Sequence, residues 1–190
     1  MRKRLERCIF LDKFTKNCNF KFFVGILFLI SGCSCKTSYM NKTVVKEFDL
    51  NRYLGTWYEI ARYDHRFERA LVGVTATYSL REEGKIRVVN RGYKGSFDGK
   101  MSEAIGKAKI PDPNQKSRLK VSFFLFFYAD YLIMELDPDY QWAVVGSKSD
   151  NYLWILSRKP IIEEDLYQEI LEKLRNRGYN TGKLIKVEQR

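Results

Sequence analysis

The feature that most constrains the fold is a series of short segments in which apolar and polar residues alternate, separated by turn residues at nearly even intervals. Side chains of a β-strand point to opposite faces with period two, so this pattern predicts an antiparallel barrel or sandwich. Eight strands are enough to close a barrel around one small ligand, and the predicted class is therefore all-β, up-and-down. The expected strands are residues 56–63, 73–81, 85–93, 101–110, 117–124, 131–137, 141–147 and 152–158.

One helix is expected after the last of these strands. Ile162, Leu166, Ile170 and Leu174 recur every four residues, which places them on one face of a helix. Acidic residues occupy its first turn and Gly178 follows its end, as helix termini favour. We expect this C-terminal helix to pack on the outside of the sheet, followed by a short strand over residues 183–187.

The first 32 residues are typical of an export signal. A basic stretch leads into an apolar run over residues 22–30, which is shorter than the roughly 20 residues that a membrane-spanning helix needs. Small residues then precede Cys33, and Ile30-Ser31-Gly32-Cys33 resembles the bacterial lipobox. The resemblance implies a lipid anchor on Cys33, and Ser34 after it implies sorting to the bacterial outer membrane. We therefore expect a signal peptide over 1–32, a polar, flexible tether over 33–46 and one barrel domain over 47–190.

Charge and cysteine content exclude several functional classes. Residues 1–32 hold seven Lys or Arg against two acidic residues and so supply much of the net charge of +11, while the rest of the chain intersperses both signs. That pattern is typical of a solvated β surface, and no nucleic-acid partner is expected. Of four cysteines, only Cys35 would remain unmodified in the exported chain, so neither a disulfide framework nor a thiolate metal site is predicted. No cofactor or metal is expected.

Three motifs then occur in order. Residues 55–62 (Gly-Thr-Trp-Tyr-Glu-Ile-Ala-Arg) open the first strand, residues 136–143 (Leu-Asp-Pro-Asp-Tyr-Gln-Trp-Ala) join the sixth and seventh, and residues 153–158 (Leu-Trp-Ile-Leu-Ser-Arg) close the eighth. Together they resemble the three conserved regions of the lipocalins, most closely the bacterial outer-membrane lipoprotein and apolipoprotein D branch. The resemblance implies that Gly55, Trp57 and Arg158 form the barrel closure, with Arg158 lying across the Trp57 indole as a cation over an aromatic ring.

Alternation from an inward Trp57, matched to the family pattern, assigns the ligand-binding face. Its expected members are Glu59, Ala61, Tyr63, Ala76, Tyr78, Ile86, Val88, Asn90, Val121, Phe123, Leu132, Met134, Tyr152 and Trp154. This lining is largely apolar and aromatic, as an acyl chain requires, so a fatty acid or lysophospholipid is the expected ligand. The alternative is that these side chains fill the barrel completely.

The opposite end is expected to be the mouth. Arg66 and Phe67 lie in the loop after the first strand, where guanidinium groups could pair with a carboxylate or phosphate headgroup. Phe126 and Phe127 belong to an apolar run after the fifth strand, where bacterial relatives usually have a Gly-Pro pair. We expect this run to contact a membrane, a second copy in a homodimer, or the ligand tail, the alternative being that it folds back as core.

Catalysis has little support in the sequence. His65 is the only histidine, and it is expected to be solvent-exposed or to contact a headgroup. No Gly-x-Ser-x-Gly motif occurs. A lipid carrier that is not an enzyme is therefore predicted. The alternatives are a lipid- or pigment-modifying enzyme built on the same barrel, and an envelope scaffold whose barrel is incidental.

Overall fold

The structure is a computed structural model that describes residues 39–81 and 85–190. The expected signal peptide, the lipidation site Cys33, the first part of the tether and the turn at 82–84 lie outside the described residues. Statements below on what the structure contains refer to the described residues.

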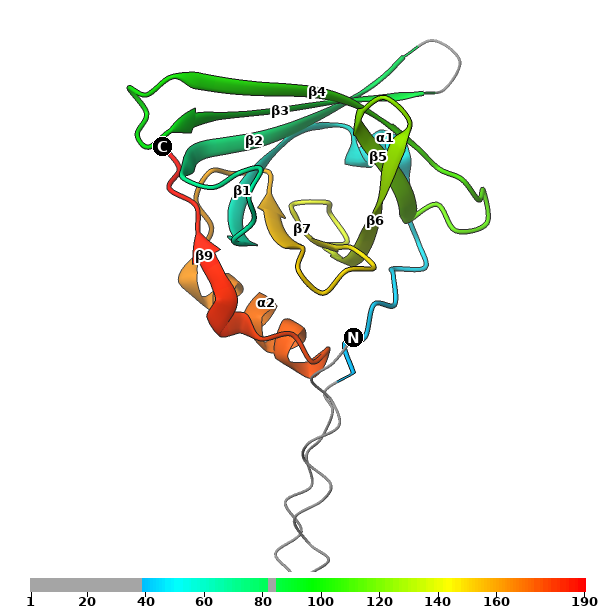
Figure 1. The fold of residues 1–190 in the computed structure, drawn as a ribbon. Helices are drawn as coiled ribbons and strands as arrows, with labels where there is room; N and C mark the ends of the chain where they lie inside the picture. Colours follow the sequence, from blue (N-terminus) through cyan, green and yellow to red (C-terminus); the bar gives the residue numbers. More distant parts are fainter. Residues whose placement is uncertain (1–38, 82–84) are drawn as a thin grey trace, which may run out of the picture. The chain divides into compact units, whose positions relative to one another are not determined.

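Eight antiparallel strands form one closed ring, as the sequence predicts. Each strand pairs with its neighbours in chain order, and β1 pairs with both β2 and β8, which closes the barrel seen in Figure 1. The strands are β1 (Gly55–Tyr63), β2 (Leu71–Leu80), β3 (Ile86–Lys94), β4 (Met101–Lys109), β5 (Arg118–Phe124), β6 (Phe127–Leu136), β7 (Trp142–Gly146) and β8 (Leu153–Ser157).

The C-terminal helix α2 (Glu164–Asn176) packs outside this barrel, which confirms the prediction. Its buried residues Ile170 and Leu174 join a hydrophobic cluster with the outward side chains of β1, β6, β7 and β8. The short 3-10 helix η2 (Thr181–Lys183) and the strand β9 (Leu184–Lys186) follow. A short helix, α1 (Leu50–Tyr53), was not predicted; the Asp49 side chain caps it by accepting from the Asn51 amide. Over the described residues, no helix has the length and apolarity to cross a bilayer.

The largest difference in strand boundaries is at β6, which begins at Phe127 rather than near residue 131. Phe127 pairs with Phe124 of β5, so only Leu125 and Phe126 remain as the turn. The pairing of β5 with β4 ends at Ser122, before this turn. The apolar run is therefore the tip of a tight hairpin that continues beyond the last pair with β4.

Residues 39–46, expected to belong to a flexible tether, instead lie against the barrel. The Asn41 amide donates to the Arg177 carbonyl at 2.8 Å, and the Val45 amide donates to the Ile133 carbonyl at 3.0 Å. Met40 and Val44 pack against the cluster that contains α2. Hydrophobic contacts that sequence alternation does not reveal thus place the start of the folded domain before residue 47.

One end of the barrel is sealed by Trp57. The guanidinium carbon of Arg158 lies 3.8 Å from the centroid of the Trp57 ring, in the arrangement that the lipocalin resemblance implied. Arg158 also donates to the carbonyls of Arg52, Leu54 and Thr56 at 2.8–2.9 Å. Gly55 has φ +97°, and a Cβ there would lie 3.3 Å from Arg158 Nη1. Glycine is thus favoured at this position both by its conformation and by the close approach of Arg158.

The C-terminal tail fills a seam on one side of the barrel. β1 pairs with β2 only from Gly55 to Tyr58, and beyond a short gap it pairs with β9 (Figure 1). The Gln189 amide donates to the carbonyls of Glu59 on β1 and Val74 on β2 at 2.8 and 3.0 Å. The tail therefore provides hydrogen-bond partners where the two strands have separated.

This seam predicts that Gln189→Ala lowers the free energy of unfolding by about 1–2 kcal/mol, because two partly buried carbonyls lose their donors. The measurement is urea denaturation, combined with amide hydrogen exchange of β2. Glu188→Ala is the matched control, because Glu188 acts through its backbone carbonyl, which accepts from the Gly73 amide at 2.7 Å. Equal stability of both variants would contradict a bridging role of Gln189.

The sealed end predicts that Arg158→Ala destabilises the fold by about 3 kcal/mol, because several charge-assisted hydrogen bonds and one cation–π contact are lost together. Arg158→Lys should have an intermediate stability, since an ammonium group cannot reach all these carbonyls at once. Arg175→Ala, at a surface ion pair on α2, should change stability by less than about 0.5 kcal/mol. Urea denaturation of the three variants distinguishes these outcomes.

Candidate functional site: the barrel interior

Strand register identifies the inner face. Trp57 pairs with Ala76, Ala76 with Asn90, and Asn90 with Ala104, so these four residues point to the same side of the sheet. Because Trp57 plugs the barrel, that side is the interior. The buried cluster around Trp57 brings together these further predicted members of the interior: Tyr78, Ile86, Val88 and Val121, with Trp154 packed against them.

Three tyrosines fill the interior next to the seal. The Tyr131 hydroxyl lies 2.7 Å from the hydroxyls of both Tyr53 and Tyr78. Burial raises the pKa of all three phenols, so they remain neutral. They satisfy one another's polar groups in an otherwise apolar base. Neither Tyr53 nor Tyr131 was expected in the interior, and this part of the barrel is closed by protein side chains.

Above the tyrosines the inner face remains accessible. Ala76, Asn90 and Trp154 are only half-buried although they point inward, and the inward Ala104 is exposed. The amide oxygen of Asn90 is itself buried and has no hydrogen-bond partner among the described residues. The interior is thus filled at its base and accessible to solvent higher up.

Two of the predicted interior positions are wrong because of a β-bulge at Ile60. Glu59 pairs with Leu156 but Ala61 pairs with Ile155, so one extra residue interrupts the alternation. Ala61 and Tyr63 consequently point outward, into the cluster that contains α2, rather than into the barrel.

Two further positions, Leu132 and Met134 on β6, also lie in the outer cluster with α2. Tyr131 and Ile133 face the interior instead, because Tyr131 pairs with the inward Leu119 of β5. The sequence could not reveal this, because α2 covers the outer face and both faces of β6 are therefore apolar. The Tyr179 hydroxyl donates to the Met134 sulfur at 3.2 Å, which places Met134 outside.

The same bulge turns Arg62 inward, into a charged network that the sequence analysis missed. Arg62 is 2% exposed and donates to Glu59 Oε1 at 2.8 Å. Its other terminal nitrogen donates to the Glu68 carbonyl at 2.6 Å. The Trp154 indole N–H donates to Glu68 Oε2 at 3.1 Å. The interior lining is therefore more polar than an alternation pattern predicts.

His65 belongs to this network. It is buried, whereas solvent exposure was one of the two expectations for it. Its side chain is buried, with Nε2 3.0 Å from Glu68 Oε2. Its ring centroid lies 5.4 Å from those of both Tyr152 and Trp154, which stack on each other. The loop after β1 thus folds over the upper interior, and its histidine packs against the aromatic lining.

The two carboxyl groups of the network have opposite pKa shifts. Burial raises the pKa of Glu59 well above its ordinary value, and the neighbouring Glu68 raises it further, against the opposing effect of Arg62. For Glu68, burial also acts to raise the pKa, but the contacts with His65, Trp154 and Arg62 lower it below its ordinary value. Glu59 therefore takes up a proton more readily than Glu68.

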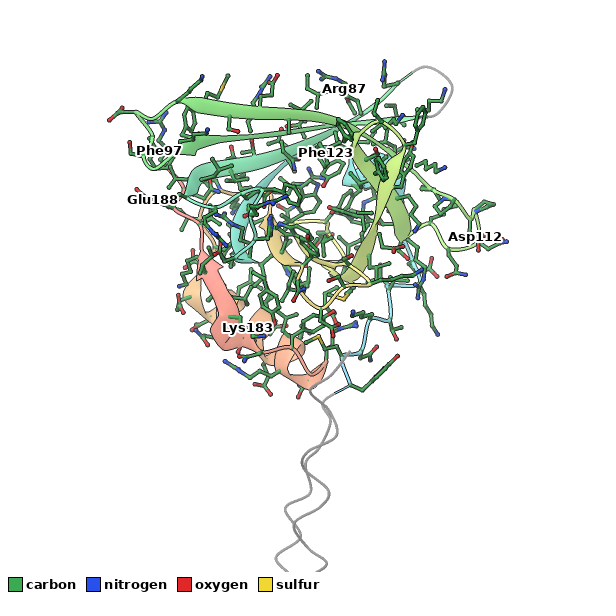
Figure 2. All side chains as sticks on the ribbon, in the orientation of Figure 1. Arg87, Phe97, Asp112, Phe123, Lys183 and Glu188 are labelled. Atoms are coloured by element: carbon green, nitrogen blue, oxygen red, sulfur yellow. The ribbon has the colours of Figure 1, made fainter. Side chains whose placement is uncertain are left out.

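The rim carries the other predicted residues. The Phe123 ring lies over the backbone of Gly106 on β4, on the interior side, and is 44% exposed (Figure 2). Phe67 is exposed, with the Arg66 guanidinium 5.7 Å from its ring centroid. Phe126 and Phe127 are also exposed, at the tip of the β5–β6 hairpin. Direct ligand contact by any of these residues stays a prediction.

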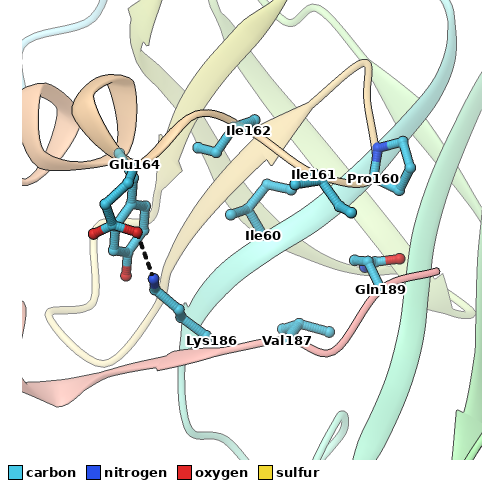
Figure 3. Close-up of a pocket in the computed structure, with 9 residues that line it drawn as sticks. Ile60, Pro160, Ile161, Ile162, Glu164, Lys186, Val187 and Gln189 are labelled. Atoms are coloured by element: carbon cyan, nitrogen blue, oxygen red, sulfur yellow. Dashed lines mark hydrogen bonds and ion pairs between the residues drawn. The ribbon is translucent and has the colours of Figure 1, made fainter.

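A separate pocket of about 170 Å³ lies on the outer surface (Figure 3). It is lined by Ile60, Pro160, Ile161, Ile162, Glu164, Tyr167, Lys186, Val187 and Gln189. The Lys186 ammonium pairs with Glu164 at 3.1 Å within it. Because Ile60 points outward at the bulge, this pocket is distinct from the barrel interior.

The pKa shifts predict a pH dependence of stability. Glu59 binds a proton in the folded state where the unfolded chain does not, so its contribution to stability falls as the pH rises from about 4.5 toward its raised pKa. Glu59→Gln, which stays uncharged, should therefore lose less stability than the wild type as the pH rises above about 4.5.

Glu68→Gln is the paired variant, because a lowered pKa gives stability that is present above about pH 4.5 and lost as the pH falls. It should be less stable than the wild type at neutral pH. Thermal unfolding measured on both sides of pH 4.5 checks both variants, and parallel curves for wild type and Glu59→Gln would contradict the assignment to Glu59.

Comparison with known proteins agrees with this geometry. The outer membrane lipoprotein Blc of Escherichia coli strain K12 is 47% identical over 162 residues, which cover 85% of this chain and 91% of that protein. Mouse apolipoprotein D is 32% identical over 154 residues, covering 77% of this chain and 79% of that protein. Among solved structures, insecticyanin from the tobacco hornworm shares the fold, with a TM-score of 0.62 at 19% identity, covering 77% of this chain and 84% of that chain.

Residues 48–189 match the family model described as a lipocalin-like domain. This range includes the sealed end, the whole barrel and the C-terminal helix. The chain belongs to the lipocalin family.

Proposed function

We propose that this chain is a bacterial outer-membrane lipoprotein, anchored through Cys33, that holds a fatty acid or lysophospholipid in its barrel and stores or transports it. The observation that carries the proposal is an inner face that remains accessible above a base sealed by Trp57. The lipobox-like residues 30–33 and the similarity to an outer membrane lipoprotein support the anchor and the location.

The interior offers an acyl chain the surfaces that it requires. Trp154 and Phe123 present accessible apolar surface, and the small side chains of Ala76 and Ala104 leave space beside it. Burying one methylene group contributes about 0.8 kcal/mol. A tail of about a dozen carbons could therefore reach micromolar affinity after the cost of association.

Two polar groups suit the head of the ligand, one in the same row as Ala76 and Ala104 and one at the rim. The buried Asn90 amide oxygen lacks a partner among the described residues and can accept a hydrogen bond from a hydroxyl group. Arg66, exposed on the loop at the rim, can pair with a carboxylate or phosphate. A lysophospholipid provides both chemistries, a hydroxyl on the glycerol and a phosphate further out.

The contacts of Glu68 favour binding of a ligand over its chemical conversion. The Glu68 oxygen that faces His65 also accepts from Trp154, so this carboxylate fixes the aromatic lining. An enzyme on this barrel would instead alter the bound lipid. Mass analysis of a lysophospholipid incubated with the purified protein should return it unchanged, and His65→Ala should not alter that result.

Filling the interior tests the binding site directly. Ala104→Trp should weaken binding of a fluorescent fatty acid at least about tenfold, because the indole occupies the space that the tail would use. Ile105→Trp is the matched control, because Ile105 is the next residue on β4 and points to the outside, where it is 53% exposed. Equal affinities of the two variants, measured by fluorescence titration, would contradict an interior site.

A further inference from the structure

The tip of the β5–β6 hairpin is a continuous exposed apolar surface. Phe124, Leu125, Phe126 and Phe127 are 67%, 60%, 85% and 75% exposed, and they are consecutive in the chain. Single exposed apolar residues are ordinary on protein surfaces, but four large ones at one projecting turn mark an interaction site. We call these four residues the apolar tip.

The backbone holds the apolar tip in place. Phe124 pairs with Phe127, and their rings stack with centroids 6.3 Å apart and planes inclined by 15°. The Ser122 hydroxyl donates to the Phe124 carbonyl at 3.3 Å, just before the turn. The pairing thus fixes the backbone of the turn, and the two stacked rings support each other at its base.

The two turn residues, Leu125 and Phe126, are not those that would make this turn most stable. Leu125 has φ +46°, a left-handed conformation that glycine or asparagine adopts far more readily than leucine. Two-residue hairpin turns ordinarily use Asn-Gly or a similar pair. A leucine followed by a phenylalanine thus retains exposed apolar side chains at a position where a polar turn would be easier to form.

Positive charge lies beside this hairpin, at the Phe126 ring of the apolar tip and at the neighbouring Tyr128. The Lys107 ammonium is 5.9 Å from the Phe126 ring centroid and 5.8 Å from that of Tyr128, and Lys109 is 4.6 Å from the latter. Neither lysine pairs with a carboxylate of the described residues. Apolar rings next to such ammonium groups are complementary to a lipid bilayer, in which an apolar layer lies beneath negatively charged headgroups.

A second loop at the same end of the barrel has a related composition. Phe67, between β1 and β2, is 73% exposed, and the Arg66 guanidinium lies beside its ring. Loops after β1 and β5 share one end because the strands alternate in direction.

We propose that the apolar tip inserts into the interface of a bilayer rich in anionic phospholipid, with Lys107 and Lys109 at the headgroups. This contact is independent of the acyl anchor expected on Cys33. It is also independent of the interior ligand site, so its failure would leave the proposed function intact. A symmetric dimer through the tip is the competing arrangement, but it would bring the lysines of both copies into one interface, where like charges repel.

The test places a reporter at the tip of the full chain. The Phe126→Trp variant is reconstituted in vesicles of phosphatidylcholine alone or with phosphatidylglycerol, each with brominated acyl chains that quench nearby tryptophan. The wild-type signal is subtracted, which leaves the emission of the introduced tryptophan. We expect this emission to be blue-shifted, and to be quenched at least twofold more in the anionic vesicles.

Two control variants make the result specific. Ile161→Trp, at a 72% exposed apolar position in the segment between β8 and α2, should not be quenched, because it lies away from the tip. Adding Lys107→Glu and Lys109→Glu to Phe126→Trp should remove the preference for anionic lipid.

Two outcomes would overturn the proposal. One is unquenched, solvent-like emission of the introduced tryptophan in both kinds of vesicle while the anchor holds the protein on them. The other is a blue shift that occurs without vesicles and grows with protein concentration, which would assign the tip to a second copy of the chain.

Discussion

The packing of Arg158 over Trp57 is the contact on which the rest of this barrel depends. An eight-stranded ring is wide enough to leave space inside, and closing one end restricts access to that space to the opposite end. The Arg158 guanidinium covers the indole and at the same time binds the carbonyls of Arg52, Leu54 and Thr56. One side chain thus fixes α1 beneath the barrel and satisfies backbone groups at the start of β1.

A single extra residue in β1 has effects on both sides of the sheet. The bulge at Ile60 directs Ile60 and Ala61 outward toward α2, and directs Arg62 inward toward Glu59 and Glu68. Beyond the bulge, β1 has left β2 and pairs with the C-terminal strand. The charged network in the interior and the filled seam in the wall therefore have a common origin.

The interior and the rim of the barrel carry different kinds of side chain. The base is closed by tyrosine rings, the middle is apolar with small residues that leave space, and in the upper part Arg62 and His65 both contact Glu68. The apolar tip lies outside this sequence of layers, on a hairpin that projects from the rim. The proposed lipid carrier would need both an interior that receives the tail and an exterior that can approach the bilayer.

The sequence by itself determined the family, the eight strands, the outer helix and the closing pair Trp57 and Arg158, because motifs and period-two alternation carry this information locally. It also placed Ala76, Asn90 and Val121 on the inner face, where strand pairing and packing put them. Tertiary structure alone decided which side Ala61, Tyr63, Leu132 and Met134 take. A bulge leaves no local signal in composition, and a strand covered by α2 is apolar on both faces, so only pairing with neighbouring strands sets its orientation.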